Sequence, residues 1–357
     1  MKIPHTLFAG AFFSGMLFFT ACTPATREPE TQYVLGTFCT INLFDKGNSG
    51  LYSLAFDKIR RLEDIFSANL EGTDLDMVNK SSGLYPVKVR PELIDVLEKA
   101  LEYAEKSGGA FDPTVGPLVK LWGIGTDRER VPEKEEIQST LEFVNYREVE
   151  INRKEGTVFL KRPGMALDLG AIAKGYAADE TAKLLINKGV DSGIIDLGGN
   201  IFVIGERKER SGKGAYWRVG IQDPRADRGN YIGILNVKNK SVVTSGMYER
   251  FFEKDGKRYH HIFSIGLQSA GLQSAANGFP VENNLLSVTI AADNSIDADA
   301  LSTAAFVLGW EKGQELIAGV KGAGGIFVFD DLTVRVTENL EEYFTLTAAE
   351  YRLRIYP

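Results

Sequence analysis

Residues 165–179 read MALDLGAIAKGYAAD and place a carboxylate, a turn and a lysine at the start of an amphipathic helix, which we expect to end at Gly189. The first N–H groups of a helix have no acceptor within the helix, and a helix N-terminus attracts anions. Segment 170–174 is therefore predicted to hold a phosphate, and Lys174 would add a full positive charge. The alternative is a helix whose glycines serve a tight turn and whose lysine is solvated.

The segments before this helix predict a strand, two helices and a hairpin. Residues 32–44 alternate as one strand, and apolar residues recur at helical spacing from Leu54 to Phe66. A second helix is predicted over 91–107 and another near 134–143. The hairpin pairs 149–152 with 157–161 across a turn that contains glycine.

The segments after Gly189 predict mostly strands. Residues 193–204 form one buried strand interrupted by two glycines, and a helix runs to Leu308 with Asp297 as its N-cap. A further helix is expected over 311–320. The remaining strands are predicted at 217–222, 231–237, 248–253 paired with 258–263, 285–291, 325–329 and 332–336, followed by a final segment over 344–355. Runs of strands between separate helices indicate an α+β fold, in one large domain or two lobes.

The N-terminal sequence predicts export and a lipid anchor. Residues 1–21 carry Lys2 and an apolar run, which is typical of a secretory signal and too short for a comfortable membrane span. Cys22 follows the small residue of the expected cleavage site, as in a bacterial lipobox, and 22–31 is a polar linker. We therefore expect lipid on Cys22 and a membrane-anchored lipoprotein, facing the periplasm or held elsewhere in the cell envelope. The alternative is an ordinary signal peptide with an incidental cysteine.

Composition excludes several classes of protein. A net charge of −7, from 48 acidic and 41 basic residues, argues against nucleic acid as a partner. Cys39 is the only cysteine besides Cys22, so we expect no disulfide. The three histidines, His5, His260 and His261, are too few for a histidine-rich zinc site. The 44% of hydrophobic residues allow residues 32–357 to bury a large core.

Two groups of polar residues could carry chemistry. Asp299 and Thr303 lie four residues apart on a predicted helix and so share a face, and their oxygens suit Mg²⁺. The alternative is that both are merely solvated. His260 and His261 could supply a proton-transfer group or a phosphate donor, and their spacing does not choose between them.

Six short motifs occur in a fixed order along the chain. They are 34–40 (VLGTFCT), 109–116 (GAFDPTVG), 167–179 (LDLGAIAKGYAAD), 196–200 (DLGGN), 244–246 (TSG) and 299–303 (DALST). Together they resemble the ApbE family, the FAD:protein FMN transferases, over about residues 31–308. The resemblance implies an α+β fold related to the T-fold class, Mg²⁺ in the site and FAD as the substrate. It also implies transfer of FMN, through a phosphoester bond, to a Thr or Ser hydroxyl of a partner flavoprotein, with release of AMP.

The same resemblance assigns roles to individual residues. It implies that Lys174 assists catalysis through its charge, that Asp299 acts through the metal, and that His261 or a nearby carboxylate is the general base. The implied metal ligands are the Ala171 carbonyl, Asp299 and Thr303. The residues implied in binding FAD are Leu35, Asn69, Ala110, Phe111, Asp112, Asp168, Lys174, Ile262 and Phe263.

Two departures from the family pattern leave the activity open. Residues 67–69 read SAN where many members have an aromatic residue, and 261–266 (HIFSIG) lack the usual aspartate and proline. A more open site would admit water, so Mg²⁺-dependent hydrolysis of FAD to FMN and AMP is an alternative activity. A lipoprotein that only binds FAD is a second alternative, and a substrate-binding or adhesion lipoprotein a third. The presence of both Asp299 and Thr303 favours an enzyme, because a pure binder needs no metal at the pyrophosphate.

Overall fold

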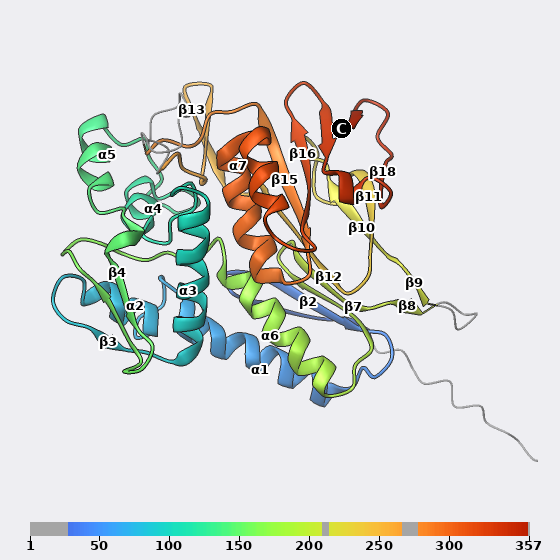
Figure 1. Cartoon of the computed structure of the whole chain (residues 1–357), viewed down its shortest axis with the longest axis horizontal. Helices are drawn as coiled ribbons and strands as arrows, with labels where there is room; N and C mark the ends of the chain where they lie inside the picture. The colour runs from blue at the N-terminus through green and yellow to red at the C-terminus, as the bar shows by residue number, and fades with distance from the viewer. Residues whose placement is uncertain (1–27, 209–213, 266–277, 356–357) are drawn as a thin grey trace, which may run out of the picture.

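A nine-stranded sheet runs through the computed structural model, which describes residues 28–208, 214–265 and 278–355 (Figure 1). Neighbouring strands are antiparallel, except that the last two are parallel. In spatial order the strands are β1 (Glu30–Val34), β2 (Thr37–Leu43), β6 (Ser192–Leu197), β7 (Asn200–Gly205), β12 (Lys240–Gly246), β15 (Leu285–Ala292), β16 (Gly324–Phe329), β17 (Thr333–Val336) and β19 (Arg352–Ile355).

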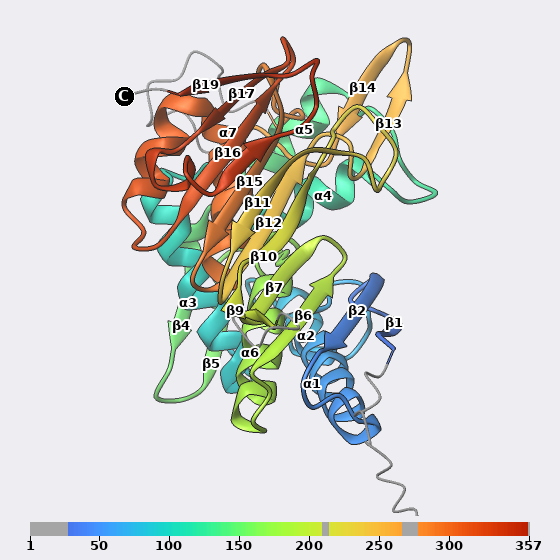
Figure 2. The ribbon, with the colours of Figure 1, turned by 90° about the vertical axis from the view of Figure 1, so that its right-hand side faces the viewer.

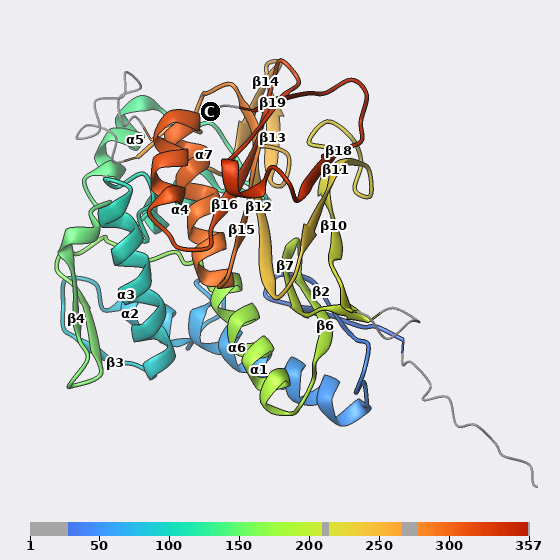
Figure 3. The same cartoon turned by 45° about the vertical axis from the view of Figure 1, so that its right-hand side comes forward.

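Four long helices gather on one side of this sheet (Figure 3). They are α1 (Ser49–Phe66), α3 (Pro91–Lys106), α6 (Ala173–Asn187) and α7 (Ser295–Ala318). Helix α1 begins where the Asn48 side chain accepts a hydrogen bond from the N–H of Leu51, as expected of an N-cap. Its buried face follows from helical spacing, with Tyr52, Phe56 and Ile59 fully inaccessible to solvent. These helices and the inner face of the sheet form the largest hydrophobic core.

A small three-stranded sheet packs on part of the opposite face (Figure 2). Its strands are β10 (Trp217–Gln222), β11 (Tyr231–Val237) and β18 (Phe344–Leu346). Trp217 and Leu235 of this sheet share a second core cluster with Val328 of the large sheet. The molecule is therefore a mixed α+β domain with apolar layers on both faces of its main sheet, which confirms the predicted fold class.

The shorter elements complete the fold. Helices α4 (Gly116–Trp122) and α5 (Lys134–Leu141) form a third cluster around Trp122, whose indole N–H donates to the Gly278 carbonyl. The short helices are α2 (Asp74–Lys80), α4 (Gly116–Trp122) and α5 (Lys134–Leu141), with 3₁₀ turns at Tyr146–Glu148 and Glu338–Leu340. The short strands are β3 (Val87–Lys88), β4 (Val149–Asn152), β5 (Thr157–Leu160), β8 (Arg207–Lys208), β9 (Gly214–Ala215), β13 (Phe251–Lys254) and β14 (Lys257–His260).

Two segments predicted as single strands are hairpins. Residues 32–44 contain the end of β1, which begins at Glu30 within the predicted linker, and all of β2. The two strands are joined at Leu35 and Gly36, whose φ angles are 56° and 68°. Residues 193–204 contain most of β6 and β7, which are joined at Gly198 and Gly199, with φ of 68° and 95°. Two successive residues with positive φ reverse a chain within two residues, so the alternation of side chains continues on both sides of the turn. A Cβ on Gly198 would lie 2.5 Å from the Thr37 side chain, so the two turns lie side by side.

Helix α7 differs from its prediction at both the cap and the middle. Its N-cap is Asn294, and Asp297 lies inside the first turn, where its carboxylate accepts from the Tyr103 hydroxyl at 2.7 Å. The assignment of Asp297 as the cap is therefore wrong. Gly309, with φ 76° and ψ −177°, interrupts the helix between the two stretches predicted as separate helices.

One residue of α1 also differs from its prediction. Leu54 was expected on the buried face of this helix, but 45% of its surface is exposed.

Candidate functional site

The N-termini of α6 and α7 meet beside the candidate metal ligands. The Oδ2 atom of Asp299, which is buried, accepts from the N–H of Gly175 at 2.9 Å. A Cβ on Gly175 would lie 2.4 Å from the Ser295 carbonyl oxygen, so only glycine allows the helices to approach this closely. Asp299 of α7 is therefore held against the first turn of α6, which contains Lys174.

The predicted phosphate site in segment 170–174 needs correction. Three of its five backbone N–H groups already have acceptors: that of Gly170 donates to Asp168 Oδ1 at 2.8 Å, and those of Ile172 and Ala173 donate to the Leu169 carbonyl. The Lys174 ammonium group donates to the Gly170 carbonyl at 3.0 Å. An anion here would therefore be held chiefly by the positive charge of Lys174, and less by free N–H groups at the helix end.

Lys174 acts electrostatically on two other elements. Burial raises the pKa of Cys39 on β2 to about 12, and the charge of Lys174 opposes that rise. Burial lowers the pKa of His261 to about 3, and the charges of Arg250 and Lys174 lower it further. Lys174 therefore lies within electrostatic reach of both β2 and the segment after β14, so two of the predicted catalytic residues belong to one region.

The structure distinguishes the two neighbouring histidines. The buried His260 lies with Nε2 3.0 Å from the Val281 carbonyl and with Nδ1 3.3 Å from the N–H of Ile262. This pattern requires a neutral ring with its proton on Nε2, and it gives His260 a structural role. His261 is partly buried, with Nδ1 3.1 Å from the Arg250 carbonyl, so Nδ1 donates and Nε2 is the nitrogen that can accept a proton.

The buried, neutral state of His260 predicts a pH effect on stability. Burial lowers its folded-state pKa to about 4, below the unfolded value of 6.5. The contribution of neutral His260 to the free energy of unfolding is therefore at its maximum above pH 6.5. It is lost as the pH falls from 6.5 toward about 4, because the unfolded chain takes up a proton that the folded protein does not. In urea titrations across this window, we expect the free energy of unfolding to fall more steeply for the wild-type protein than for His260→Gln. Parallel curves for the two proteins would contradict this role.

The candidate metal ligands offer oxygen atoms only. Thr303 Oγ1 lies 3.1 Å from Ser245 Oγ, which also contacts Ser302 Oγ at 2.8 Å. Motif 244–246 therefore packs against the turn of α7 that carries Thr303. The described residues contain no group of three or more His, Cys, Asp or Glu that could hold a metal ion. One carboxylate with a hydroxyl and the Ala171 carbonyl fits Mg²⁺, which commonly takes one or two protein carboxylates together with phosphate oxygens of the substrate.

Loop 110–114 is joined to the segment that leads into α6. The Pro113 carbonyl accepts from the N–H of Asp168 at 2.8 Å, so Ala110, Phe111 and Asp112 lie near Asp168 in the fold. The buried carboxylate of Asp112 accepts from the N–H and hydroxyl of Thr114 and from the N–H of Tyr146. Burial raises its pKa despite these bonds. The Asp112 side chain therefore stabilises the conformation of loop 110–114. A contact between this loop and FAD would be made by backbone atoms of the loop.

The other candidate FAD-binding residues fall into two groups. The Leu35 N–H donates to Glu63 Oε1 near the end of α1, and the exposed Asn69 lies in the turn after that helix. Ile262 and Phe263 are 4% and 5% exposed and pack in core clusters. Their side chains support the loop. The Ile262 N–H and carbonyl are also occupied, by His260 Nδ1 and the N–H of Val281, so Ile262 has a structural role here.

Sequence reasoning missed Asn79, a positioning residue on α2. Its side chain accepts from the N–H of Leu167 at 2.7 Å and donates to the Leu167 carbonyl at 3.0 Å. The amide thus mimics a strand partner and fixes the segment that carries Asp168. No sequence pattern pointed to it, because 88 residues separate the two partners.

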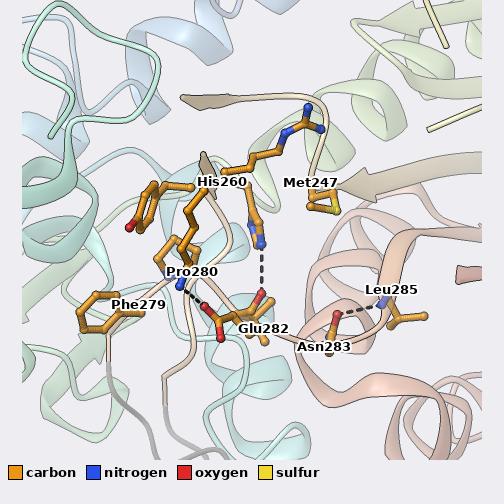
Figure 4. Close-up of a pocket in the computed structure, with 11 residues that line it drawn as sticks. Met247, His260, Phe279, Pro280, Glu282, Asn283 and Leu285 are labelled. Carbon is orange, nitrogen blue, oxygen red and sulfur yellow. Dashed lines mark hydrogen bonds and ion pairs between the residues drawn. The ribbon is translucent and has the colours of Figure 1, made fainter. Parts of the chain in front are cut away.

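A cavity of about 150 Å³ lies between the β13–β14 hairpin and the segment leading into β15 (Figure 4). His260 and Met247 line it, and the ion pair of Lys257 with Glu282 lies at its wall. Sites for drug-sized ligands typically enclose about 300–1,000 Å³. This cavity is too small for FAD.

The predicted signal peptide and Cys22, the predicted site of lipid attachment, lie outside the described residues, as does most of linker 22–31. Within the described part of the chain, no helix combines the length and apolar character that a membrane span requires.

The fold and site together define a mixed α+β protein whose polar centre lies where the N-termini of two helices meet. A profile of the ApbE family matches residues 35–327, and the chain belongs to this family. It is 38% identical over 337 residues to the FAD:protein FMN transferase of Treponema pallidum (strain Nichols), covering 91% of this chain and 90% of the relative. It is 37% identical over 281 residues to the FAD:protein FMN transferase of Klebsiella pneumoniae (strain 342), covering 79% and 83%.

Solved structures give the same result. The crystal structure of the ApbE protein from Thermotoga maritima MSB8 aligns with a TM-score of 0.78 at 31% identity, covering 88% of this chain and 98% of that chain. The apo form of the flavinyl transferase ApbE from Pseudomonas stutzeri aligns with a TM-score of 0.74 at 27% identity, covering 88% and 96%.

Proposed function

We propose that this protein is an Mg²⁺-dependent FAD:protein FMN transferase, which attaches FMN by a phosphoester bond to a Thr or Ser of a partner flavoprotein and releases AMP. Relatives that align over most of the chain carry the name FAD:protein FMN transferase. The observation that carries the proposal is the contact of Asp299 with the first turn of α6, beside Lys174. This contact joins the carboxylate to the residue that follows Lys174 in the chain.

The residues of the site suit a reaction at a pyrophosphate. Asp299, Thr303 and the Ala171 carbonyl would hold Mg²⁺, which neutralises phosphate oxygens when bound. The charge of Lys174 would stabilise the same oxygens. His261 Nε2 would accept the proton of the attacking hydroxyl. The low pKa of His261 keeps the ring neutral and also makes it a weak base, so a nearby carboxylate is the alternative acceptor.

We also propose that the protein is exported and held at the membrane by lipid on Cys22. This proposal rests on the apolar N-terminal run followed by a small residue and a cysteine. The acceptor proteins would then be flavoproteins of the cell envelope. Mass spectrometry of the membrane fraction tests it, since an unmodified Cys22 would exclude the anchor.

Hydrolysis of FAD to FMN and AMP is the second candidate activity, favoured by one observation. Asn69 is exposed in the turn after α1, where its small amide leaves more room than an aromatic ring. Water would take the place of the acceptor hydroxyl and would use the same metal and leaving group.

The Asn69→Tyr variant tests this reading of the turn. With FAD and an acceptor present, we expect free FMN to fall severalfold relative to protein-bound FMN, because a ring here would restrict water. The matched control is Leu70→Tyr, which adds a ring at the next residue, itself 46% exposed. An unchanged ratio of free to protein-bound FMN in Asn69→Tyr would show that Asn69 does not control the access of water.

The direct test of function uses the full-length protein with FAD, in Mg²⁺ or in EDTA, with AMP and FMN followed by chromatography. AMP formed only with Mg²⁺ and an acceptor, together with protein-bound FMN, is the result expected of the transferase. AMP with free FMN in the absence of an acceptor would establish the hydrolase. FAD that binds but stays intact with acceptor present would indicate a carrier.

A further inference from the structure

Helices α6 and α7 each place a carboxylate on the first turn of the other. Asp179 of α6 accepts from the N–H groups of Ser295 and Ile296, at 2.6 and 2.9 Å. In return, Asp299 of α7 accepts from the N–H of Gly175 in α6 at 2.9 Å. We call this pair of contacts the reciprocal cap. It satisfies N–H groups that would otherwise lack partners at both helix ends.

The sheet also holds the first residue of α7. The Ser295 hydroxyl donates to Asn200 Oδ1 on β7 at 2.6 Å and accepts from the Ser241 hydroxyl on β12 at 2.8 Å. All three side chains are at most 1% exposed. The start of α7 is therefore fixed from two directions, by the sheet through Ser295 and by α6 through Asp179.

Capping alone does not require a charged group at residue 179. Asn and Ser cap helices about as well as Asp, and they do so without burying a charge. Burial raises the pKa of Asp179 to about 7, even though its two N–H partners lower it. A carboxylate differs from an amide because it offers two acceptor oxygens, and Asp179 uses one for each N–H.

We propose that Asp179 is a positioning residue for the reaction, because it sets the start of α7 and thereby the direction of Asp299 and Thr303. This inference rests on the proposed function. Asp299 lies one turn beyond the N–H groups that Asp179 holds, and Thr303 lies one turn further. If the first turn of α7 frays, both oxygen ligands move relative to Ala171 and Lys174 on the α6 side.

The test measures metal binding directly. The full-length chain, purified in mild detergent with FAD and no acceptor, is titrated with Mn²⁺ as a probe for Mg²⁺, and free Mn²⁺ is followed by electron paramagnetic resonance. In Asp179→Asn the amide nitrogen faces one of the two N–H groups. We expect its half-saturating Mn²⁺ concentration to rise about 10–100-fold, the range typical of residues that orient metal ligands.

The matched control is Glu180→Gln, which removes the next carboxylate of the same helix. Glu180 pairs with Lys58 at 2.8 Å and takes no part in the reciprocal cap. Its Mn²⁺ affinity should stay within about twofold of the wild type, well short of the change expected for a residue that orients ligands. Asp179→Glu keeps both acceptor oxygens on a longer side chain, and it replaces Asp179→Asn in the test if that variant does not fold. It too should bind Mn²⁺ more weakly.

The outcomes separate this inference from the proposed function. If the Asp179 variants fold and bind Mn²⁺ as tightly as the wild type, the inference about Asp179 is wrong. A lower unfolding temperature in these variants would then indicate only a structural role for Asp179. If the wild-type protein with FAD takes up no Mn²⁺, the proposed metal site fails and the inference fails with it.

Discussion

Asp299→Asn is expected to reduce Mg²⁺-dependent turnover of FAD at least about 100-fold, because metal stabilisation of phosphoryl charge is worth several kcal/mol and each 1.36 kcal/mol is a factor of ten. The Asn side chain keeps an oxygen for the Gly175 N–H, so the contact at 2.9 Å can persist. The fold should therefore survive while the charged ligand is lost. Steady-state release of AMP, measured against Mg²⁺ concentration, gives the comparison.

Asp297→Asn is the matched control on the same helix. Its carboxylate lies 3.3 Å from the Lys99 ammonium group and 2.7 Å from the Tyr103 hydroxyl, so it joins α7 to α3. We expect this variant to lose stability and to keep the Mg²⁺ dependence of the wild type. If Asp299→Asn retains full activity, the metal assignment is wrong.

Gly175→Ala is expected to have the largest effect on the fold around the site. The new Cβ would lie 2.4 Å from the Ser295 carbonyl oxygen and 2.6 Å from the Ile296 Cα, and both are backbone atoms that a side-chain rotation cannot move. Overpacking of this kind typically costs about 1–3 kcal/mol, and we expect the upper end. Separation of α6 from α7 would also draw Asp299 away, so turnover should fall together with the denaturation midpoint in urea.

The control is Gly319→Ala at the other end of α7. Gly319 is the C-cap residue, with a negative φ of −71° and a ψ of −6° that an alanine can adopt, and its nearest new contact would be at 3.4 Å. The same added methyl should therefore be tolerated. A Gly175→Ala protein as stable as this control would show that the helices can separate without cost.

The sequence was informative where a pattern repeats within one element. The spacing of apolar residues predicted α1 and α3, and the strands at 217–222 and 231–237 were placed with the bounds that the structure shows. It failed where the alternation of one strand continues through a two-residue turn, as at Gly36. It also failed at β12, whose residues 244–246 were interpreted only as a motif.

The sequence was sufficient to predict which residues belong to the candidate site, but not which of them contact one another. Spacing alone placed Asp299 and Thr303 on one helix face, and the structure confirms that both lie on α7. The partners of these residues come from distant parts of the chain, as when Gly175 meets Asp299 across 124 residues. Local patterns carry no information on such pairings. For the same reason, the neutral state of His260 became evident only from its two hydrogen bonds.

The order of strands in the main sheet bears on how the chain folds. Its two edges are β1 and β19, the first and last strands of the described chain, and β2 pairs with β6 through contacts such as Cys39 with Leu197. Pairings between such distant segments make folding slow. Until the C-terminal strand arrives, β17 presents an open edge to which another chain can add. A chain in which β17 is still unpaired is therefore open to strand addition from another copy, so a chaperone that shields this strand should raise the yield of native protein.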